Sequence, residues 1–173
     1  MPATLSVTES QLFTALRTFL LDSLGGGVEV IQTQNNRVPM PKGPFVAMTP
    51  IRIDGLSSSV TGYTATSRSD TRTTQWQVQL DFYGSQAAMQ AATVAQLWRT
   101  SWAAEQLASG PLQPLYPGEP LQTTMVNGEM QWESRWTLDL FAQFNPITTV
   151  SQQTATALTI GLAEIDTEFP PGA

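Results

Sequence analysis

The sequence predicts an α+β domain in which two main helices pack on a curved, mainly antiparallel β-sheet. Two segments headed by tryptophan, Trp76–Tyr83 and Trp136–Phe144, alternate between apolar and polar residues, which is the pattern of strands with one buried face. Residues 8–24 and 85–108 have the length and apolar spacing of helices. Because the strand patterns alternate, they favour antiparallel pairing over a parallel sheet buried on both faces.

The length and composition indicate one globular domain over residues 1–173. A chain of 173 residues can form one core and is too short for two ordinary domains. Charged residues make up 13%, about half of the usual share of roughly 25%, so the polar surface consists mainly of Gln, Thr, Ser and Asn. Amides and hydroxyls are less costly to bury than ions, so this surface suits large contacts with other proteins.

The first elements are the N-terminal helix and the strands after it. The helix is expected over residues 8–24, because its apolar residues share one stripe and the three glycines at 25–27 favour a helix end. Strands are expected over 28–34 and 45–53, the second bent or at a sheet edge because Pro50 lacks an amide donor. A capping box at the start of the helix can come from Ser6 with Glu9 or from Thr8 with Gln11.

The middle of the chain combines a polar stretch, an Ala-rich helix and an irregular stretch. Residues 55–74 predict a projecting hairpin or loop, and the helix over 85–108 is expected to break near Thr100. Residues 112–121 are rich in proline and predict irregular structure. The helix residues expected to face the sheet are Met89, Ala92, Leu97 and Trp98.

The C-terminal third is expected to hold a hairpin, a short strand and a tail. Asn127-Gly128 is a strong turn signal and would lead into the strand that contains Trp136–Phe144. A short strand is expected over 157–165, and residues 166–173 predict an extended, loosely held tail.

The chain contains few of the side-chain types that act in catalysis. There is no Cys and no His, which excludes thiolate and imidazole nucleophiles, bases and metal ligands. A carboxylate pair, Asp81 with Asp139 or Glu129 with Glu133, and a lone nucleophile at Lys42 stay open as minor alternatives. We therefore predict no enzyme activity, no cofactor and no metal site.

Charge and hydropathy restrict the partners. The net charge is −6, and the eight basic side chains are scattered, so the clustered cations that grip nucleic acid are missing. The N-terminus lacks the basic region and following apolar run of a signal peptide. No stretch has the roughly 18 apolar residues in a row that are needed to cross a membrane. We expect a protein that is made and used in the cytoplasm and contacts no membrane.

A stiff loop over residues 35–44 is the best candidate for a binding surface. Its three prolines fix the backbone before any partner arrives, which lowers the entropic cost of recognition; a plain connector is the alternative. Trp132 fits either the core or an interface, and the C-terminal tail is suited to reaching a neighbour. The candidate interface residues are Arg37, Val38, Pro39, Met40, Pro41, Lys42, Pro44, Trp132 and Phe169.

Two long segments resemble a known family. The run Asn36-Arg-Val-Pro-Met-Pro-Lys-Gly-Pro-Phe-Val-Ala-Met-Thr-Pro-Ile51 is similar to the neck or tail terminator proteins of contractile-tailed phages. Trp132-Glu-Ser-Arg-Trp-Thr-Leu-Asp-Leu-Phe141, followed by Asn145-Pro146, is the second match. The order of the remaining elements also agrees, so the resemblance covers nearly the whole chain and implies a tail-terminator-like fold.

The resemblance implies a structural role in the virion. Such proteins form a ring, typically a hexamer, that caps the finished tail tube, joins it to the head-completion or connector proteins and leaves a channel for DNA. The implied partners are further copies of this chain, the tube protein and the connector protein, with the sheath protein as a further candidate. DNA would pass without specific binding, and assembly would take place in the host cytoplasm.

Two other functions stay open at this point. The chain could be another phage morphogenesis subunit, such as a tail tube, baseplate or head-completion protein, since these share a polar, β-rich and Cys-poor composition. A carbohydrate-binding or hydrolytic module that uses exposed Trp side chains and carboxylates is the less favoured alternative.

Overall fold

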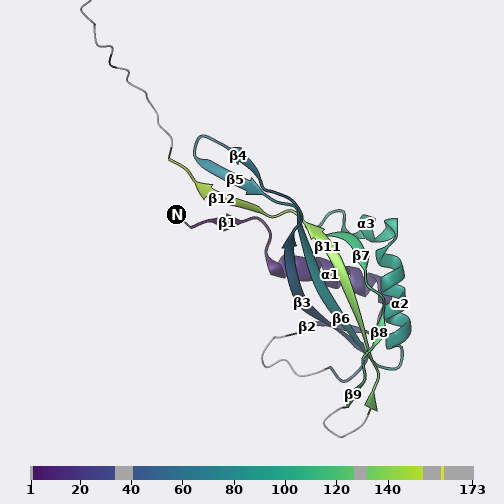
Figure 1. The fold of residues 1–173 in the computed structure, drawn as a ribbon. Coiled ribbons are helices and arrows are strands. Elements are labelled where there is room, and N and C mark those ends of the chain that lie inside the picture. Colours follow the sequence, from purple (N-terminus) through teal and green to yellow (C-terminus); the bar gives the residue numbers. More distant parts are fainter. Residues whose placement is uncertain (1, 34–40, 127–131, 154–160, 162–173) are drawn as a thin grey trace, which may run out of the picture.

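The computed structural model describes residues 2–33, 41–126, 132–153 and 161. Within them the chain is α+β, with a six-stranded sheet, a four-stranded sheet, a two-stranded hairpin and three helices. Figure 1 shows the four-stranded sheet projecting from one end of the main sheet. The α+β class is confirmed, and the polar stretch predicted as a projecting hairpin does form one.

The main sheet is mainly antiparallel, as predicted. Its strands run in the order β2 (Glu29–Gln32), β3 (Phe45–Gly55), β6 (Thr74–Tyr83), β11 (Arg135–Phe144) and β7 (Gln113–Pro117), and β8 (Leu121–Gln122) also pairs with β11. The two Trp-headed strands, β6 and β11, are antiparallel neighbours along their whole length. The parallel pair β2–β3 is the exception to the antiparallel pattern.

Pro50 lies in a part of β3 where the missing amide hydrogen costs the sheet no hydrogen bond to β2. The pairing of β2 with β3 ends at Met48, so β3 forms the edge of the sheet from Pro50 onwards. The register between β3 and β6 also shifts between Pro50 and Arg52. Both features confirm the expectation of a bent or edge strand at this proline.

The three helices lie on one side of the main sheet (Figure 1). They are α1 (Glu9–Leu24), α2 (Ala87–Trp98) and α3 (Ser101–Leu107). The capping box of α1 is formed by Thr8 and Gln11, and Gly25 ends the helix with a positive φ of 74°. The predicted break near Thr100 is confirmed, since Thr100 is the N-cap of α3.

The core lies between the helices and the inner face of the sheet. Trp76 of β6 packs edge-on against Phe13 of α1, with ring centroids 5.1 Å apart. Trp98 of α2 packs in the same way against Phe19, at 5.0 Å. The largest fully buried side chains are Trp76, Trp98, Phe19, Phe82, Leu16, Leu20, Met48, Leu80, Leu112, Leu138, Leu140 and Val46.

Two sequence predictions in this region are wrong. Met89 is 66% exposed and Ala92 is also exposed, because α2 turns a stripe of small residues, including Ala91 and Ala95, towards the core instead. The stretch over 112–121 is not irregular: most of it forms β7 and β8. Its prolines fit because β7 is an edge strand whose ladder with β11 is interrupted by a bulge.

The second sheet, called the arm below, contains segments from both halves of the chain. Its order is β1 (Thr4–Leu5), β12 (Ile147–Ser151), β5 (Ser67–Thr71) and β4 (Val60–Tyr63). Strands β4 and β5 are the predicted hairpin, whereas β12 was not predicted. Its Thr-rich sequence, ITTVS, has little of the apolar alternation that identifies a half-buried strand.

The remaining short strands form a hairpin, β9 (Met125–Val126) with β10 (Trp132–Glu133). Its turn at 127–131 lies outside the described residues, as do most of the predicted strand over 157–165 and the tail over 166–173. None of the helices in the described part has the length and apolar character needed to cross a membrane.

Candidate protein interface

A groove of about 580 Å³ opens at the end of the main sheet opposite the arm. Three segments that are far apart in the sequence form it: the end of the Pro-rich loop with the start of β3, the end of β6, and the connection between β10 and β11. Its lining residues are Pro41, Lys42, Gly43, Pro44, Phe45, Tyr83, Gly84, Ser85, Glu133 and Ser134.

Two stacked rings form the rigid part of this groove. Phe45 and Tyr83 are register partners on β3 and β6, and their rings stack 4.3 Å apart at an angle of 12°. The guanidinium carbon of Arg135 lies 6.0 Å from the centre of the Tyr83 ring. Burial raises the pKa of the Tyr83 phenol, although the positive charge of Arg135 acts in the opposite direction. Tyr83 therefore presents a neutral hydroxyl at neutral pH.

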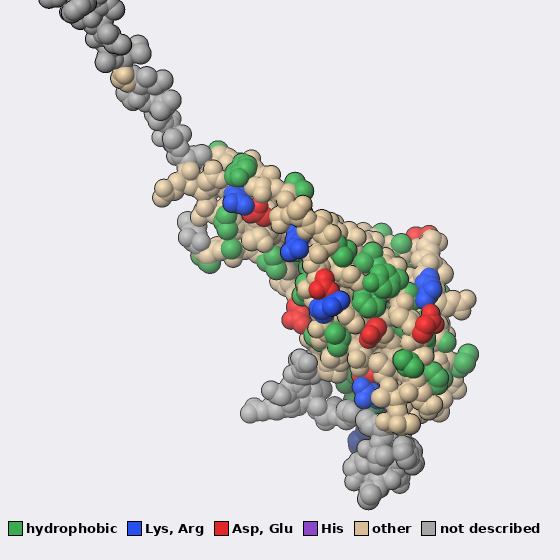
Figure 2. All heavy atoms as spheres, in the orientation of Figure 1, with side chains coloured by type: hydrophobic (Ala, Val, Ile, Leu, Met, Phe, Trp, Pro, Cys, Tyr) green, Lys and Arg blue, Asp and Glu red, His purple; other side chains and the backbone are tan. Residues whose placement is uncertain are grey.

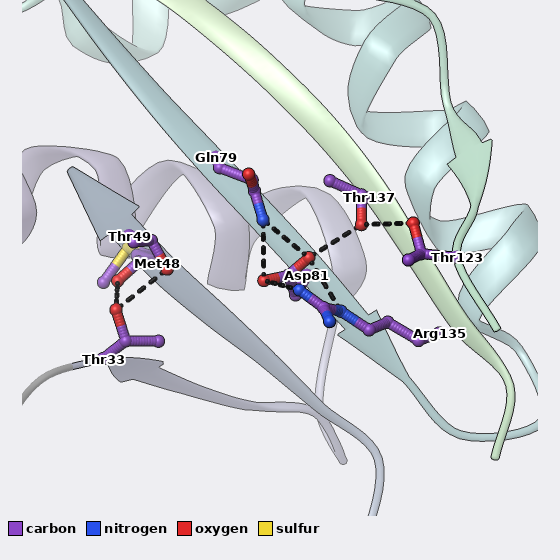
Figure 3. Close-up of polar contacts among 8 residues, drawn as sticks. All are labelled: Thr33, Met48, Thr49, Gln79, Asp81, Thr123, Arg135 and Thr137. Atoms are coloured by element: carbon purple, nitrogen blue, oxygen red, sulfur yellow. Dashed lines mark hydrogen bonds and ion pairs between the residues drawn. The ribbon is translucent and has the colours of Figure 1, made fainter. Parts of the chain in front are cut away.

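A hydrogen-bonded cluster around Asp81 supports the groove from the neighbouring rung of the sheet (Figure 3). Arg135 donates two hydrogen bonds to the carboxylate of Asp81, at 3.2 and 3.0 Å. Thr137 donates a third at 2.8 Å, and the amide of Gln79 contacts both carboxylate oxygens at 3.1 Å. Asp81 is only 4% exposed, and the ion pair with Arg135 balances its charge. The Asp81 carboxylate therefore holds the side chains of Arg135, Thr137 and Gln79 in place.

Asp81 and Asp139, the carboxylate pair that the sequence left open, each have hydrogen-bond partners of their own. The register places Asp81 opposite Thr137, whereas Asp139 lies opposite Gln79 and accepts a hydrogen bond from Gln77 at 3.2 Å. The hydrogen bond to Asp81 raises the pKa of the Arg135 guanidinium, so Arg135 stays charged. The other proposed pair includes Glu129, which lies outside the described residues.

The start of the Pro-rich loop is fixed on β3. The hydroxyl of Thr33 donates to the carbonyl of Met48 at 3.0 Å and lies 2.8 Å from the hydroxyl of Thr49 (Figure 3). The loop's other end is the groove wall, where Pro41 is half-buried and Lys42 and Pro44 are exposed. Both ends of the loop are therefore attached to the same strand.

The remaining predicted interface residues are only partly visible. Arg37, Val38, Pro39, Met40 and Phe169 lie outside the described residues. The backbone of Trp132 is placed in β10, next to the groove, while its side chain belongs to the undescribed part. Pro41, Lys42 and Pro44 do lie together. The sequence did not indicate that Tyr83, Glu133 and Ser134 would join them.

Gly84 shapes the groove, because it lets the chain turn closely under Pro44. Its φ is +112°, and an added Cβ would lie 3.2 Å from the Cβ of Pro44. We expect Gly84→Ala to lower the free energy of unfolding by about 1–2 kcal/mol, the cost of a side chain in this backbone region. Urea unfolding checks the value, with Gly43→Ala as the control, since open space surrounds Gly43. Equal effects for the two variants would contradict the role of Gly84.

The face of the main sheet that carries no helix is sparsely charged. Figure 2 shows this face, with a few acidic and basic side chains among uncharged ones. Tyr116 of β7 and Phe141 of β11 stack here with ring centroids 4.5 Å apart, and the amide of Gln75 donates to the Tyr116 hydroxyl at 2.9 Å. Among the described residues there is no cluster of acidic side chains that could hold a metal ion. The face suits protein contact better than chemistry.

The chain matches the family model for the phage neck terminator protein over residues 10–171. It belongs to the phage neck terminator family. This is a family of structural proteins of the phage tail, so the terminator is a virion component and not an enzyme. No curated protein matches the sequence.

A solved structure supports the fold of the terminator. The sheath/tube terminator of an extracellular contractile injection system, PVC, in its extended state is similar with a TM-score of 0.52 and 12% identity. The match covers 96% of the terminator but 66% of that longer chain. The likeness shows a tube-terminator fold, and it confirms the fold class expected from the sequence resemblance.

Proposed function

We propose that this terminator forms a hexameric ring that caps the finished tail tube, joins it to the head-completion proteins and leaves a channel for DNA. The carrying observation is the family match over residues 10–171, which includes the groove and three of the four strands of the arm. Two of the three segments that form the groove belong to the stretches that resembled terminators in sequence, 36–51 and 132–141. Assembly takes place in the host cytoplasm, and the ring stays in the neck of the virion.

The groove is the proposed contact between neighbouring copies in this ring. Closing a ring from identical subunits requires head-to-tail contacts, in which one surface meets a different surface of the next copy. The groove is open, is formed by prolines and stacked rings, and contains one free cation, Lys42, for which the described residues provide no ion-pair partner. Such a site can accept an apolar segment with an acidic neighbour.

The charge distribution supports passage of DNA without binding. The net charge is −6, which repels phosphates on average. Four of the arginines in the described part, Arg52, Arg68, Arg99 and Arg135, form ion pairs with carboxylates. These cations are already neutralised, so they release few counterions from DNA.

The axial partners follow from the capping role. We propose that one side of the ring contacts the tail tube and its outer rim contacts the sheath, as the name of the solved sheath/tube terminator suggests for that protein. The other side meets the head-completion protein. Native mass measurement tests the ring: a mass of six chains supports the proposal, and a strict monomer that also fails to bind purified tubes contradicts it.

Substitutions in the Pro-rich loop test whether it takes part in assembly. We expect Arg37→Glu and Met40→Asp to leave the unfolding temperature unchanged and to weaken ring formation by roughly tenfold or more, because each places an unpaired charge in a contact. Analytical ultracentrifugation over a concentration series gives the measurement. Met89→Asp, on the exposed side of α2, is the control. If both loop variants formed normal rings, the loop would be only a connector and would take no part in assembly.

A further inference from the structure

The arm is a sheet without a core of its own. None of the residues in its four strands is buried, and Figure 1 shows no helix over it within the described part. An isolated sheet of this size needs a second layer to be stable. Its large apolar side chains are correspondingly exposed, Val60 by 73% and Tyr63 by 67%.

The register of the arm separates its charged residues from an uncharged face. Arg68 and Asp70, which form an ion pair, lie on one face, because residues two apart along a strand share a face. The opposite face contains no charge and consists of small hydroxyl side chains with a few apolar ones. Its residues are Thr4, Thr149, Ser69, Gly62, Ile147, Thr71, Val60, Ser151 and Ser67.

Strand β4 is an unprotected edge. It pairs with β5 on one side and has no strand on the other side within the described residues. Its sequence, Val60-Thr-Gly-Tyr63, has no charge and no proline, and its pairing with β5 has no bulge. Charges, prolines and bulges are devices that prevent an edge from pairing with another chain. Because β4 has none of them, its edge is open to a further strand.

We propose that residues 157–165 of a neighbouring copy add to the arm as a strand beside β4, which links consecutive copies in the ring. The proposal rests on the ring proposed above. The segment has apolar side chains at Leu158, Ile160 and Leu162, and it is uncharged up to Glu164. A strand of this pattern matches an uncharged edge, since neither β4 nor residues 157–163 contain a charge that would have to be desolvated.

Charge gives the direction of the added strand. Arg72 lies at the base of the arm, where its side chain covers Gly55 and donates to the carbonyl of Ser57. It forms no ion pair among the described residues. A strand antiparallel to β4 would place Glu164 and Asp166 at this base. The acidic end of the segment then meets an available cation.

Residues 157–165 of a neighbouring copy fit the edge of β4 better than the same residues of the chain itself. Strand β12, which precedes the segment, is flanked on both sides by β1 and β5, so the segment cannot pair beside it. A return to the chain's own β4 would add a fifth strand to a sheet that still lacks a second layer. A neighbouring copy contributes the strand and brings its own arm close enough to cover the uncharged face.

Engineered cysteines test the exchange directly, because the chain has no cysteine of its own. Thr61→Cys and Thr159→Cys are prepared as separate chains of different mass, mixed during assembly, and then oxidised or treated with a short bismaleimide. Exchange between copies predicts a covalent dimer that contains one chain of each kind. Thr93→Cys, exposed on α2, mixed with Thr159→Cys, is the matched control and is expected to give none.

The outcomes separate this proposal from the proposed function. Rings that form without the mixed dimer, or an internal link in a Thr61→Cys/Thr159→Cys double variant, overturn the exchange and leave the ring intact. Mixed dimers from chains that close no ring support the docking and overturn the ring.

A second variant, Val60→Lys, is expected to keep the unfolding temperature and weaken association roughly tenfold, whereas Leu121→Lys, equally exposed on β8, is expected to have no effect. Unchanged association in Val60→Lys also counts against the proposal.

Discussion

Replacement of Trp98 by alanine is expected to lower the free energy of unfolding by about 3–5 kcal/mol, the usual cost of removing a buried Trp or Phe. The Trp98 ring is fully buried and packs edge-on against Phe19. Its indole nitrogen donates to the carbonyl of Phe141 at 3.1 Å, where a bulge interrupts the ladder between β11 and β7. The variant therefore loses packing and also removes the indole donor from the partly buried carbonyl of Phe141.

Urea unfolding followed by circular dichroism measures this effect without using the lost tryptophan. Met89→Ala is the matched control, because Met89 is on the same helix and is exposed, so its loss is expected to cost under about 0.5 kcal/mol. A Trp98→Ala chain as stable as the control would show that α2 does not pack on the sheet as described.

Replacement of Arg135 by methionine is expected to cost about 2–4 kcal/mol. The substitution keeps most of the volume but leaves the buried Asp81 carboxylate without its cation, which is the costly way to break an ion pair. The Arg135 side chain is 25% exposed, so water can partly replace it and the lower part of the range is expected. The stacked rings of Phe45 and Tyr83 would lose their support as well.

A double-mutant cycle with Asp81→Asn separates the pair from its surroundings. Since asparagine needs no cation, adding Arg135→Met to Asp81→Asn is expected to cost clearly less than Arg135→Met alone. Arg99→Ala is the control, because its ion pair with Glu119 is exposed and is worth under about 1 kcal/mol. Additive effects of Asp81→Asn and Arg135→Met would contradict the coupling seen in the structure.

The sequence predicted the elements whose pattern depends on local spacing. Alternation identified β6 and β11 and their pairing, because every second side chain must enter the core. The capping residues and glycines gave the ends of α1. Of the α2 residues expected to face the sheet, Trp98 is buried and Leu97 packs against the core, but Met89 and Ala92 are exposed. The abundant alanines fit both an exposed and a buried stripe, so they did not indicate that Ala91 and Ala95 would face the core.

The long-range contacts that build the arm and the groove could not be predicted from local patterns. Strand β12 joins β1 and β5 from distant parts of the chain, and its Thr-rich sequence has no distinct apolar face. In the groove, the loop residues were expected, but Tyr83 and Glu133 reach them only through the register of β3, β6 and β11. Asp81 was noted for a carboxylate partner, and the same register gives it Arg135 instead.

Imaging of intact particles by electron microscopy, with this chain labelled, tests the capping role most directly. The account predicts one ring of label at the head-proximal end of the tail tube, and tails of uncontrolled or unfinished length when the chain is absent. Label spread along the tube, or normal tails joined to heads in its absence, would contradict it.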